Sequence, residues 1–535
     1  MKITKRMLVG AVFASAMLSV GGASAQVRLS GVFSDNMVLQ AGKPVKVWGW
    51  AATGAKVEVE FAGAKVSATA EGRLGEWKVT LPAMTVSKEG RELKVTERTA
   101  AGATTSVTLV NVLVGEVWIL SGQSNMQWKV NGTDDYPLVL ARANYPLLRY
   151  MQNNEGAIAM KPARQLPAAA RWVVCDTNVV GAFSATGFYF GERLMLDRDV
   201  PVGLVMTACG GTSMPNWTPY EALDRDRSFA ETRKQYEAET EDWIATNGFA
   251  GVSAALADKI DRFANDVHLA KTGKGKCPWP RPSPTIGWTG WPANRIPAAH
   301  WNAKIAPIVG LSCAGVLWYQ GETESWAWNL DNPAARFGEM LGTMIRAWRE
   351  KWGEELPFVV AQLPSMAPNS KGNLGWPVVR SRQRQLASEL AAYGAAPTLD
   401  SGWEHDVHPH DKTIVGERLA RVARRVVYGE KDVALPPVFR AAEFAAEGAK
   451  VVFASEAGLV GRGAPRGFQL KFGGEWTEAV PRLEADGSVF VASPAGKGRP
   501  DAVRYLWKGW DKPDVWLYDR QGVPVSSFSW PFMVN

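Results

Sequence analysis

Cysteine is scarce in this sequence, and its spacing limits the metal and redox chemistry that the chain can carry. Only 4 of the 535 residues are cysteines, and no two of them form a Cys-x-x-Cys pair. Structural zinc and iron–sulfur sites draw on closely spaced cysteines, so this dispersal argues against a metal cluster. An exported chain could form one or two disulfides from Cys175, Cys209, Cys277 and Cys313, although buried free thiols are the simpler expectation.

Basic clusters and long apolar runs are also missing. The formal net charge is +7, and removing the three basic residues of the first 25 leaves +4, with the other Lys and Arg interspersed among acidic residues. Nucleic acid is therefore a poor candidate partner. After residue 25 no stretch approaches the length needed to cross a bilayer, so we expect no membrane span.

The first 25 residues have the pattern of a secretory signal. A basic start from Lys2 to Arg6 precedes an apolar run from Met7 to Val20, and small residues up to Ala25 offer a cleavage site. We expect a signal peptide cut after Ala25 and a protein that is secreted or periplasmic.

The rest of the chain is long enough for several domains and changes texture twice. Residues 26–111 hold short alternating strands separated by turn residues, which predicts an antiparallel β-sandwich. Residues 112–430 alternate apolar strands with amphipathic segments, which predicts an α/β domain with a mostly parallel sheet. We interpret residues near 219–300 as a helical and loop insertion in that domain. Residues 431–535 return to strands and turns and predict a C-terminal β domain.

The stretch VGEVWILSGQSNMQW, residues 114–128, contains the first candidate for chemistry. Its apolar run predicts a buried strand that stops at small and polar residues. Ligands of open parallel sheets bind at the carboxyl ends of the strands, and a hydroxyl on a Gly-containing turn there can meet a base and backbone N–H donors. Ser124 is therefore the candidate nucleophile, although an ordinary turn would look the same if this stretch stood alone.

Two further apolar runs end in polar, Gly-containing tips. Gly210 and Gly211 follow the run VGLVMTA, and glycine lets backbone N–H groups approach a bound oxygen closely. Gln320 and Glu322 follow the run AGVLWY, so an amide donor and a carboxylate would stand at the same rim. Either pair alone would also suit a simple turn; three such strand ends together favour a catalytic site.

Three of the five histidines fall within residues 405–410, in the segment EHDVHPHD. Zinc ligation has to be considered for such a cluster. However, the other two histidines lie in no partner motif, and alternation along an extended loop would point the clustered side chains in different directions. The preferred interpretation is a general base on a loop, followed by a helix at residues 412–426.

These segments together resemble the sialate O-acetylesterase-like family of the SGNH hydrolase superfamily. The resemblance runs over nearly the whole mature chain. In chain order it rests on VFSDNMVLQ with VKVWGW, SGQSNMQW, RIPAAHWNAKIAPIVG, WYQGE, DVHP followed by DKTIVGERLA, and VRYLW. It implies an α/β fold with a flavodoxin-like α/β/α esterase core, flanked by N-terminal and C-terminal β domains. It also implies a serine esterase that removes acetyl groups from carbohydrates through an acetyl-enzyme and needs no cofactor or metal.

The resemblance implies roles for individual residues. Ser124 would be the nucleophile and His408 the base, while the backbone N–H of Ser124, a glycine of the 210–211 pair (Gly211 being preferred) and the Gln320 side chain would form the oxyanion hole. The superfamily's usual acid stands three residues before the histidine, where this chain has His405. Asp406 or Glu322 would then orient His408. The motif WYQGE also continues as Thr323-Glu324, where the family branch commonly has Ser-Asn.

The main alternative is a secreted carbohydrate-binding protein on an inactive hydrolase scaffold. Several of the 24 tryptophans lie in the loop Pro278–Trp291 and at Trp326 and Trp328, where they could stack on sugar rings. A lipase or peptidase is disfavoured because G-x-S-x-G and a long apolar lid are both missing. The sequence leaves open the glycan, the acetyl position and the oligomeric state.

Overall fold

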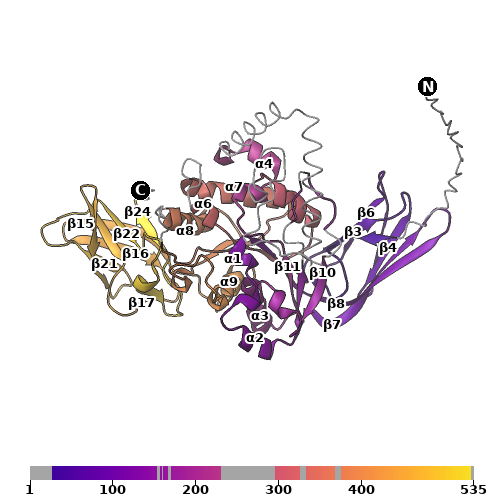
Figure 1. Ribbon diagram of the computed structural model, residues 1–535, viewed down its shortest axis with the longest axis horizontal. Helices are drawn as coiled ribbons and strands as arrows, with labels where there is room; N and C mark the ends of the chain where they lie inside the picture. Colours follow the sequence, from indigo (N-terminus) through magenta and orange to yellow (C-terminus); the bar gives the residue numbers. More distant parts are fainter. Residues whose placement is uncertain are drawn as a thin grey trace, which may run out of the picture.

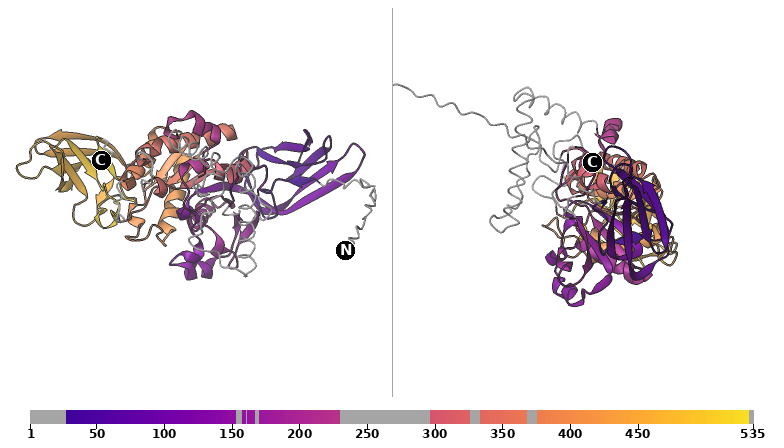
Figure 2. Two further views of the ribbon diagram at one scale, coloured as in Figure 1. Left: turned by 45° about the horizontal axis from the view of Figure 1, so that its top comes forward. Right: turned by 90° about the vertical axis from the view of Figure 1, so that its right-hand side faces the viewer.

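The computed structural model describes residues 27–152, 157–159, 161–166, 170–229, 296–325, 333–367 and 375–531. An N-terminal β region, a central α/β layer and a C-terminal β region follow one another along the long axis (Figures 1 and 2). The expected signal peptide, most of the 219–300 insertion, and the tryptophans at 326, 328 and 278–291 lie outside the described residues.

The N-terminal region is built from antiparallel strands in two groups. The first sheet has the order β1 (Arg28–Leu29), β3 (Val45–Trp50), β6 (Glu76–Leu81). The second group pairs β4 (Lys56–Phe61) with β5 (Ala64–Thr69) and β7 (Ser87–Arg98). Burial alternates along β6, as expected for a strand with one face on a core.

A single long strand connects this region to the central layer. The strand β8 (Thr104–Gly122) has 19 residues. Its first part pairs antiparallel with β7, its middle pairs with β2 (Val38–Gln40), and its last part enters the central sheet. The boundary that we expected between residues 111 and 112 therefore falls inside one continuous strand.

The central sheet has the strand order of a flavodoxin-like fold. The order is β10 (Arg171–Cys175), β9 (Tyr145–Gln152), β11 (Val202–Met206), β8, β12 (Gly315–Tyr319), β13 (Phe358–Ala361), β14 (Tyr393–Ala396). The strands β10 and β9 lie at one end of the sheet. The other five strands have the chain order 2-1-3-4-5 and are parallel. The fold class that we predicted is confirmed. In this topology the strand order reverses between β8 and β12, and folds of this kind bind ligands at the carboxyl ends of the two strands where the order reverses.

Helices cover both faces of this sheet (Figure 1). One face carries α2 (Tyr136–Arg142), α3 (Ala185–Arg198) and α9 (Thr413–Val426); the other carries α4 (Tyr220–Arg225), α6 (Glu322–Ser325), α7 (Pro333–Trp352) and α8 (Gly375–Gln385). Short 3-10 or π turns occupy Val130–Gly132, Val180–Ala182, Met214–Trp217, Arg227–Phe229, Trp301–Ile305, Ala306–Ile308, Leu386–Ser388, Leu399–Ser401 and Lys512–Asp514.

Successive side chains of β8 enter different cores. Ile119 packs in the cluster that includes Trp348 of α7, whereas Leu120 packs in the cluster that includes Phe188 of α3. Both faces are therefore apolar, which explains why the strand is a continuous hydrophobic run rather than an alternating one.

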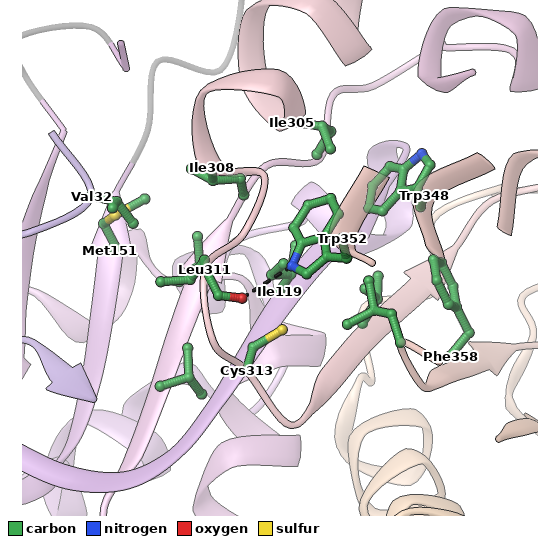
Figure 3. Close-up of a cluster of buried hydrophobic side chains, with 14 of the residues drawn as sticks. Val32, Ile119, Met151, Ile305, Ile308, Leu311, Cys313, Trp348, Trp352 and Phe358 are labelled. Atoms are coloured by element: carbon green, nitrogen blue, oxygen red, sulfur yellow. Dashed lines mark hydrogen bonds between the residues drawn. The ribbon is translucent and has the colours of Figure 1, made fainter. Parts of the chain in front are cut away.

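An aromatic cluster anchors the segment that precedes β12. Figure 3 shows Ile305, Ile308 and Leu311 gathered with Trp348 and Trp352 beside the sheet. The indole N–H of Trp352 donates to the carbonyl oxygen of Leu311 at 3.0 Å. Burying side chains of this size stabilises the fold by roughly 1.5–3 kcal/mol each. This packing fixes where β12 starts and so where it ends.

The C-terminal region is a set of antiparallel sheets. Its strands are β15 (Val438–Ala445), β16 (Gly448–Ala454), β17 (Leu459–Gly461), β18 (Phe468–Phe472), β19 (Glu475–Ala479), β20 (Pro481–Leu483), β21 (Val489–Ala492), β22 (Ala502–Tyr505), β23 (Leu517–Asp519) and β24 (Phe528–Trp530). A buried ion pair between Arg380 of α8 and Asp511 joins this region to the central layer.

Cys175 and Cys313 are buried free thiols, while Cys277 lies outside the described residues. Within the part of the chain that the structure describes, no helix is both long and apolar enough to cross a membrane.

Candidate active site

Ser124 begins the short helix α1 (Ser124–Gln127), directly after the end of β8. The backbone N–H of Gln123 donates to the carbonyl oxygen of Tyr319 at 2.9 Å, so the pairing of β8 with β12 continues up to the turn. Ser124 is partly exposed at the point where the strand order reverses. The sequence therefore places the candidate nucleophile where the topology places a ligand crevice.

The turn requires glycine at position 122. Gly122 has a φ of +122°, and a Cβ atom there would lie 2.2 Å from the carbonyl oxygen of Tyr319. A side chain would push β8 and β12 apart, because the atom that it meets is backbone.

The first residues of α3 hold the other side of the turn. Thr186 Oγ1 donates to the carbonyl oxygen of Asn125 at 3.1 Å, and Ser184 Oγ donates to that of Met126 at 2.6 Å. The carbonyl oxygens of α1 thus find donors on a neighbouring helix, which leaves α1 fixed although it is only 4 residues long.

The loop that contains His408 reaches the same turn. The ring of His408 stacks on Trp128, with centroids 5.2 Å apart and planes at 19°. Trp128 itself donates its backbone N–H to the carbonyl oxygen of Ser124 at 2.7 Å. Asn125 Nδ2 donates to the carbonyl oxygen of Val407 at 2.9 Å. The neighbours of Ser124 and His408, 284 positions apart in the chain, are therefore in direct contact.

We expected the three loop histidines to point in different directions, and for two of them this expectation was wrong. The rings of His408 and His410 both stack on Trp128, each with a centroid distance of 5.2 Å. Both rings therefore converge on the same indole, while His405 is exposed. No group of three or more His, Cys, Asp and Glu side chains in the described ranges is arranged to hold a metal ion.

Asp406 is the carboxylate beside His408. Its Oδ1 accepts the backbone N–H of His408 at 2.8 Å and lies 3.7 Å from His408 Nδ1. Oδ2 lies 3.9 Å from Nε2 of His410, whose Nδ1 is 3.2 Å from Asp134 Oδ1. The distance of 3.7 Å is too long for a hydrogen bond, and such contacts often tighten only when substrate binds.

The pKa of His408 is lowered from its ordinary value near 6.5, first by burial and then by the positive charge of Lys412 and by His410. Asp406 opposes this effect by favouring the charged ring. A lowered pKa keeps the imidazole neutral, and so able to accept a proton, at mildly acidic pH.

Glu322 does not contact His408 through a hydrogen bond that the structure shows. Its Oε1 accepts a hydrogen bond from Asn125 Nδ2 at 2.6 Å, and Lys412 Nζ donates to Asn125 Oδ1 at 2.5 Å. All three side chains are buried. Burial raises the pKa of Glu322 and lowers the pKa of Lys412 to about 7.

Gln320 lies at the end of β12, but its amide N–H groups have acceptors inside the protein. Nε2 donates to the carbonyl oxygen of Thr212 at 3.3 Å and to the carboxylate of Glu324. Glu324 also accepts the backbone N–H of Met214 at 2.6 Å, and burial raises its pKa to about 7. Gln320 can serve an oxyanion only if it exchanges one of these acceptors for the substrate.

The two glycines after β11 differ in their surroundings. The N–H of Gly210 donates to Gln127 Oε1 at 2.6 Å, which ties this loop to the end of α1. Gly211 has a φ of +70°, a conformation that glycine adopts readily. A Cβ atom on Gly210 would lie 3.4 Å from that of Ser124, so the loop and the serine are neighbours.

Sequence reasoning missed four residues of this site. No roles were assigned to Asn125, Gln127, Trp128 and Lys412, although the first three stand inside the motif SGQSNMQW. Lys412 was noted only as the start of a helix. A buried lysine has no signature in one sequence, because the same residue type is usually exposed.

Comparisons with known proteins identify the family of this chain. A family model described as carbohydrate esterase, sialic acid-specific acetylesterase matches residues 114–246 and 296–425. Sialate O-acetylesterase from Rattus norvegicus is 25% identical over 535 residues, covering 91% of each chain, and that from Mus musculus is 26% identical, covering 76% of this chain and 74% of its own. The crystal structure of a carbohydrate acetylesterase from Xanthomonas citri is 28% identical, with a TM-score of 0.74, and covers 94% of this chain and 99% of its own.

The residues that the family model matches include Ser124, Gln320 and His408. The match to the Xanthomonas structure covers 94% of this chain, so it extends beyond the central layer into both flanking β regions. The family that we inferred from the motifs is confirmed. The chain belongs to the sialic acid-specific acetylesterase family of carbohydrate esterases and is a carboxylic ester hydrolase.

Proposed function

We propose that this protein is an exported serine esterase that removes O-acetyl groups from sialic acid or a related carbohydrate through an acetyl-enzyme on Ser124. The observation that carries the proposal is the contact of the Ser124 turn with the His408 loop through Trp128 and Asn125. The names of the rat and mouse relatives support the sialate class, and the Xanthomonas structure supports carbohydrate acetyl esters more broadly.

In the proposed first half-reaction, His408 takes the proton of Ser124 while the serine oxygen attacks the acetyl carbonyl. The protonated imidazole then gives that proton to the departing sugar oxygen, which leaves as an alcohol. In the second half-reaction His408 takes a proton from water, the hydroxide attacks the acetyl-enzyme, and acetate leaves while Ser124 regains its proton. A neutral imidazole suits both transfers, consistent with the lowered pKa of His408.

The proposed oxyanion donors are the backbone N–H of Ser124, the backbone N–H of Gly211 and the side chain of Gln320. Support comes from their position at the ends of β8, β11 and β12, which are adjacent in the sheet. Asp406 is the proposed partner that orients His408, because it lies closer to that ring than any other carboxylate for which the structure gives a contact. Each oxyanion donor would contribute about 3 kcal/mol to lowering the barrier.

The test is acetate release from O-acetylated sialic acids and from a panel of acetylated xylan, xyloglucan and pectin, using wild type and Ser124→Ala. Ser388→Ala is the matched control, because Ser388 is exposed on the same layer and donates only to Gln385. We expect Ser124→Ala to lose activity by at least about 10³-fold on every substrate that wild type cleaves, with the control unchanged. Full activity in Ser124→Ala, or binding of glycans with no acetate release by wild type, would refute the proposal.

Export is a separate part of the proposal. It rests on the basic start, the apolar run and the Ala25 site of the first 25 residues. The N-terminal sequence of protein recovered from the periplasm or medium should begin at Gln26. Recovery of the full-length chain from the cytoplasm alone would contradict export and leave the esterase proposal standing.

A further inference from the structure

A buried, charged hydrogen-bond network lies directly behind the Ser124 turn. It consists of Asn125, Glu322 and Lys412, whose residues are exposed by 0%, 1% and 0%. Each comes from a different segment: Asn125 from α1, Glu322 from the start of α6 after β12, and Lys412 from the end of the His408 loop. The proposed mechanism requires these three segments to meet at one site.

The hydrogen-bond partners fix the orientation of the Asn125 amide. Protonated Lys412 Nζ can only donate, so the atom that faces it at 2.5 Å is the amide oxygen. The carbonyl oxygen of Val407 can only accept, so the atom facing it at 2.9 Å must be the amide nitrogen. Glu322 Oε1 accepts the second hydrogen of that nitrogen at 2.6 Å. Every polar atom of this amide is thereby committed.

We propose that Asn125, Glu322 and Lys412 are positioning residues that hold the His408 loop against the Ser124 turn. This inference rests on the proposed function, because it concerns how Ser124 and His408 are brought together. Asn125 directly follows Ser124, and its side chain donates to the carbonyl oxygen of Val407, so it links the Ser124 turn to the His408 loop. Glu322 and Lys412 keep its amide in the one orientation that can make that link.

Burial gives the network its strength. Water cannot replace a lost partner at these positions, so removing one leaves a buried group unsatisfied, which costs more than the net worth of an ordinary hydrogen bond. The opposite charges of Glu322 and Lys412 offset one another across the amide, and charge-assisted hydrogen bonds are roughly twice as strong as neutral ones. Burying two charges is unfavourable, and here both charges adjoin the Ser124 turn and the His408 loop, where a small displacement would lower the rate of catalysis.

Lys412 also acts on His408 through its charge. Charged and titratable groups around the His408 ring are Lys412, Asp406 and His410, and Trp128 covers one face of the ring. Lys412 favours the neutral ring and Asp406 the charged ring. Removing the lysine charge should therefore raise the pKa of His408, an effect that a purely structural residue would not have.

The first experiment compares Asn125→Ala and Asn125→Asp with wild type in hydrolysis of 4-nitrophenyl acetate. Asn125→Asp keeps the size of the side chain but turns the donor into an acceptor that faces Val407 and Glu322. Both variants should lower kcat by about 10²-fold with little change in KM, because a misplacement of about 1 Å costs about that much. Asn144→Ala, in an exposed loop of the same layer, is the control and should keep the wild-type kcat.

The second experiment measures the pH dependence of kcat/KM for Lys412→Met. The acid limb should move to higher pH, while Lys431→Met, at an exposed site, should leave it in place. If Lys412→Met does not fold, the double variant Glu322→Gln with Lys412→Met removes both buried charges and keeps an acceptor for Asn125. It should show the same upward shift.

Folded Asn125 variants with wild-type kcat would overturn the inference, and so would an unmoved acid limb in Lys412→Met or in the double variant. Ser124→Ala is assayed in parallel. Wild-type activity in Ser124→Ala would refute the proposed function itself, so the two failures are distinguishable.

Discussion

Asp406 holds the backbone of His408 more closely than it holds the ring. Its Oδ1 accepts the backbone N–H of His408 at 2.8 Å but lies 3.7 Å from Nδ1 of the same residue. The carboxylate therefore shapes the loop directly, and its effect on the imidazole is electrostatic in the absence of substrate.

Asp406→Asn should lower kcat, but by less than the roughly 10⁴-fold seen when a buried triad aspartate is replaced. The Asp406 side chain is 42% exposed, so solvent screens its charge. The acid limb of kcat/KM should also move to lower pH, because Asp406 raises the pKa of His408. Steady-state kinetics across the pH range measure both effects; an unchanged kcat with an unmoved limb would exclude Asp406 as the orienting acid.

Trp128→Ala should shift the acid limb in the opposite direction. Burial is the main cause of the lowered pKa of His408, and Trp128 covers one face of the ring. Opening that face to water raises the pKa of His408 toward 6.5, so the midpoint of the acid limb moves to higher pH in the variant. Trp476→Ala, in the C-terminal region, is the control. A midpoint in Trp128→Ala that equals the wild-type value would show that stacking does not set this pKa.

Gln320→Ala should lower kcat far more than it raises KM, by about 10²–10³-fold in kcat, if the amide stabilises the oxyanion. Both hydrogens of Nε2 have acceptors in Thr212 and Glu324, so one must be released when substrate binds. Kinetics with 4-nitrophenyl acetate separate the two parameters. A change in KM alone would instead assign Gln320 to substrate binding or to packing.

Gly122→Ala should disrupt both stability and activity. A Cβ atom there meets the Tyr319 carbonyl oxygen at 2.2 Å, so β8 and β12 must separate at the catalytic turn. Gly102→Ala is a matched control, because Gly102 also has a positive φ, +84°, but faces open space. We expect the control to lose roughly 1 kcal/mol in urea unfolding and Gly122→Ala to lose more, together with most of its kcat. Equal losses in the two variants would contradict the close approach of the strands.

The sequence predicts the strands and helices of the central layer where their patterns are strong. The run VGLVMTA forms β11, AGVLWY forms β12 and FVVAQL forms β13, and the amphipathic segment at 335–351 lies within α7. The helix α3 has a weaker signal, because nine of its 14 residues are buried and its charged residues are confined to its second half. The strand β14 is YGAA, which lacks the β-branched residues that mark a strand.

The candidate site was also predictable only where a local sequence pattern is strong. Ser124, Gln320 and Glu322 stand at strand ends that the sequence reveals, and His408 stands in a histidine-rich loop. Which carboxylate faces the imidazole depends on the path of a loop, and local sequence does not specify that path. The partnership of Asn125 with Lys412 joins residues 287 positions apart, so only the fold discloses it.

The most direct measurement is mass spectrometry of the protein quenched early in its reaction with 4-nitrophenyl acetate. Our account predicts one acetyl group on the peptide that contains Ser124, no such group in Ser124→Ala, and slower formation in His408→Ala. An acetyl group on another residue, or rapid hydrolysis by wild type with Ser124 never acetylated under conditions that trap the intermediate, would contradict it.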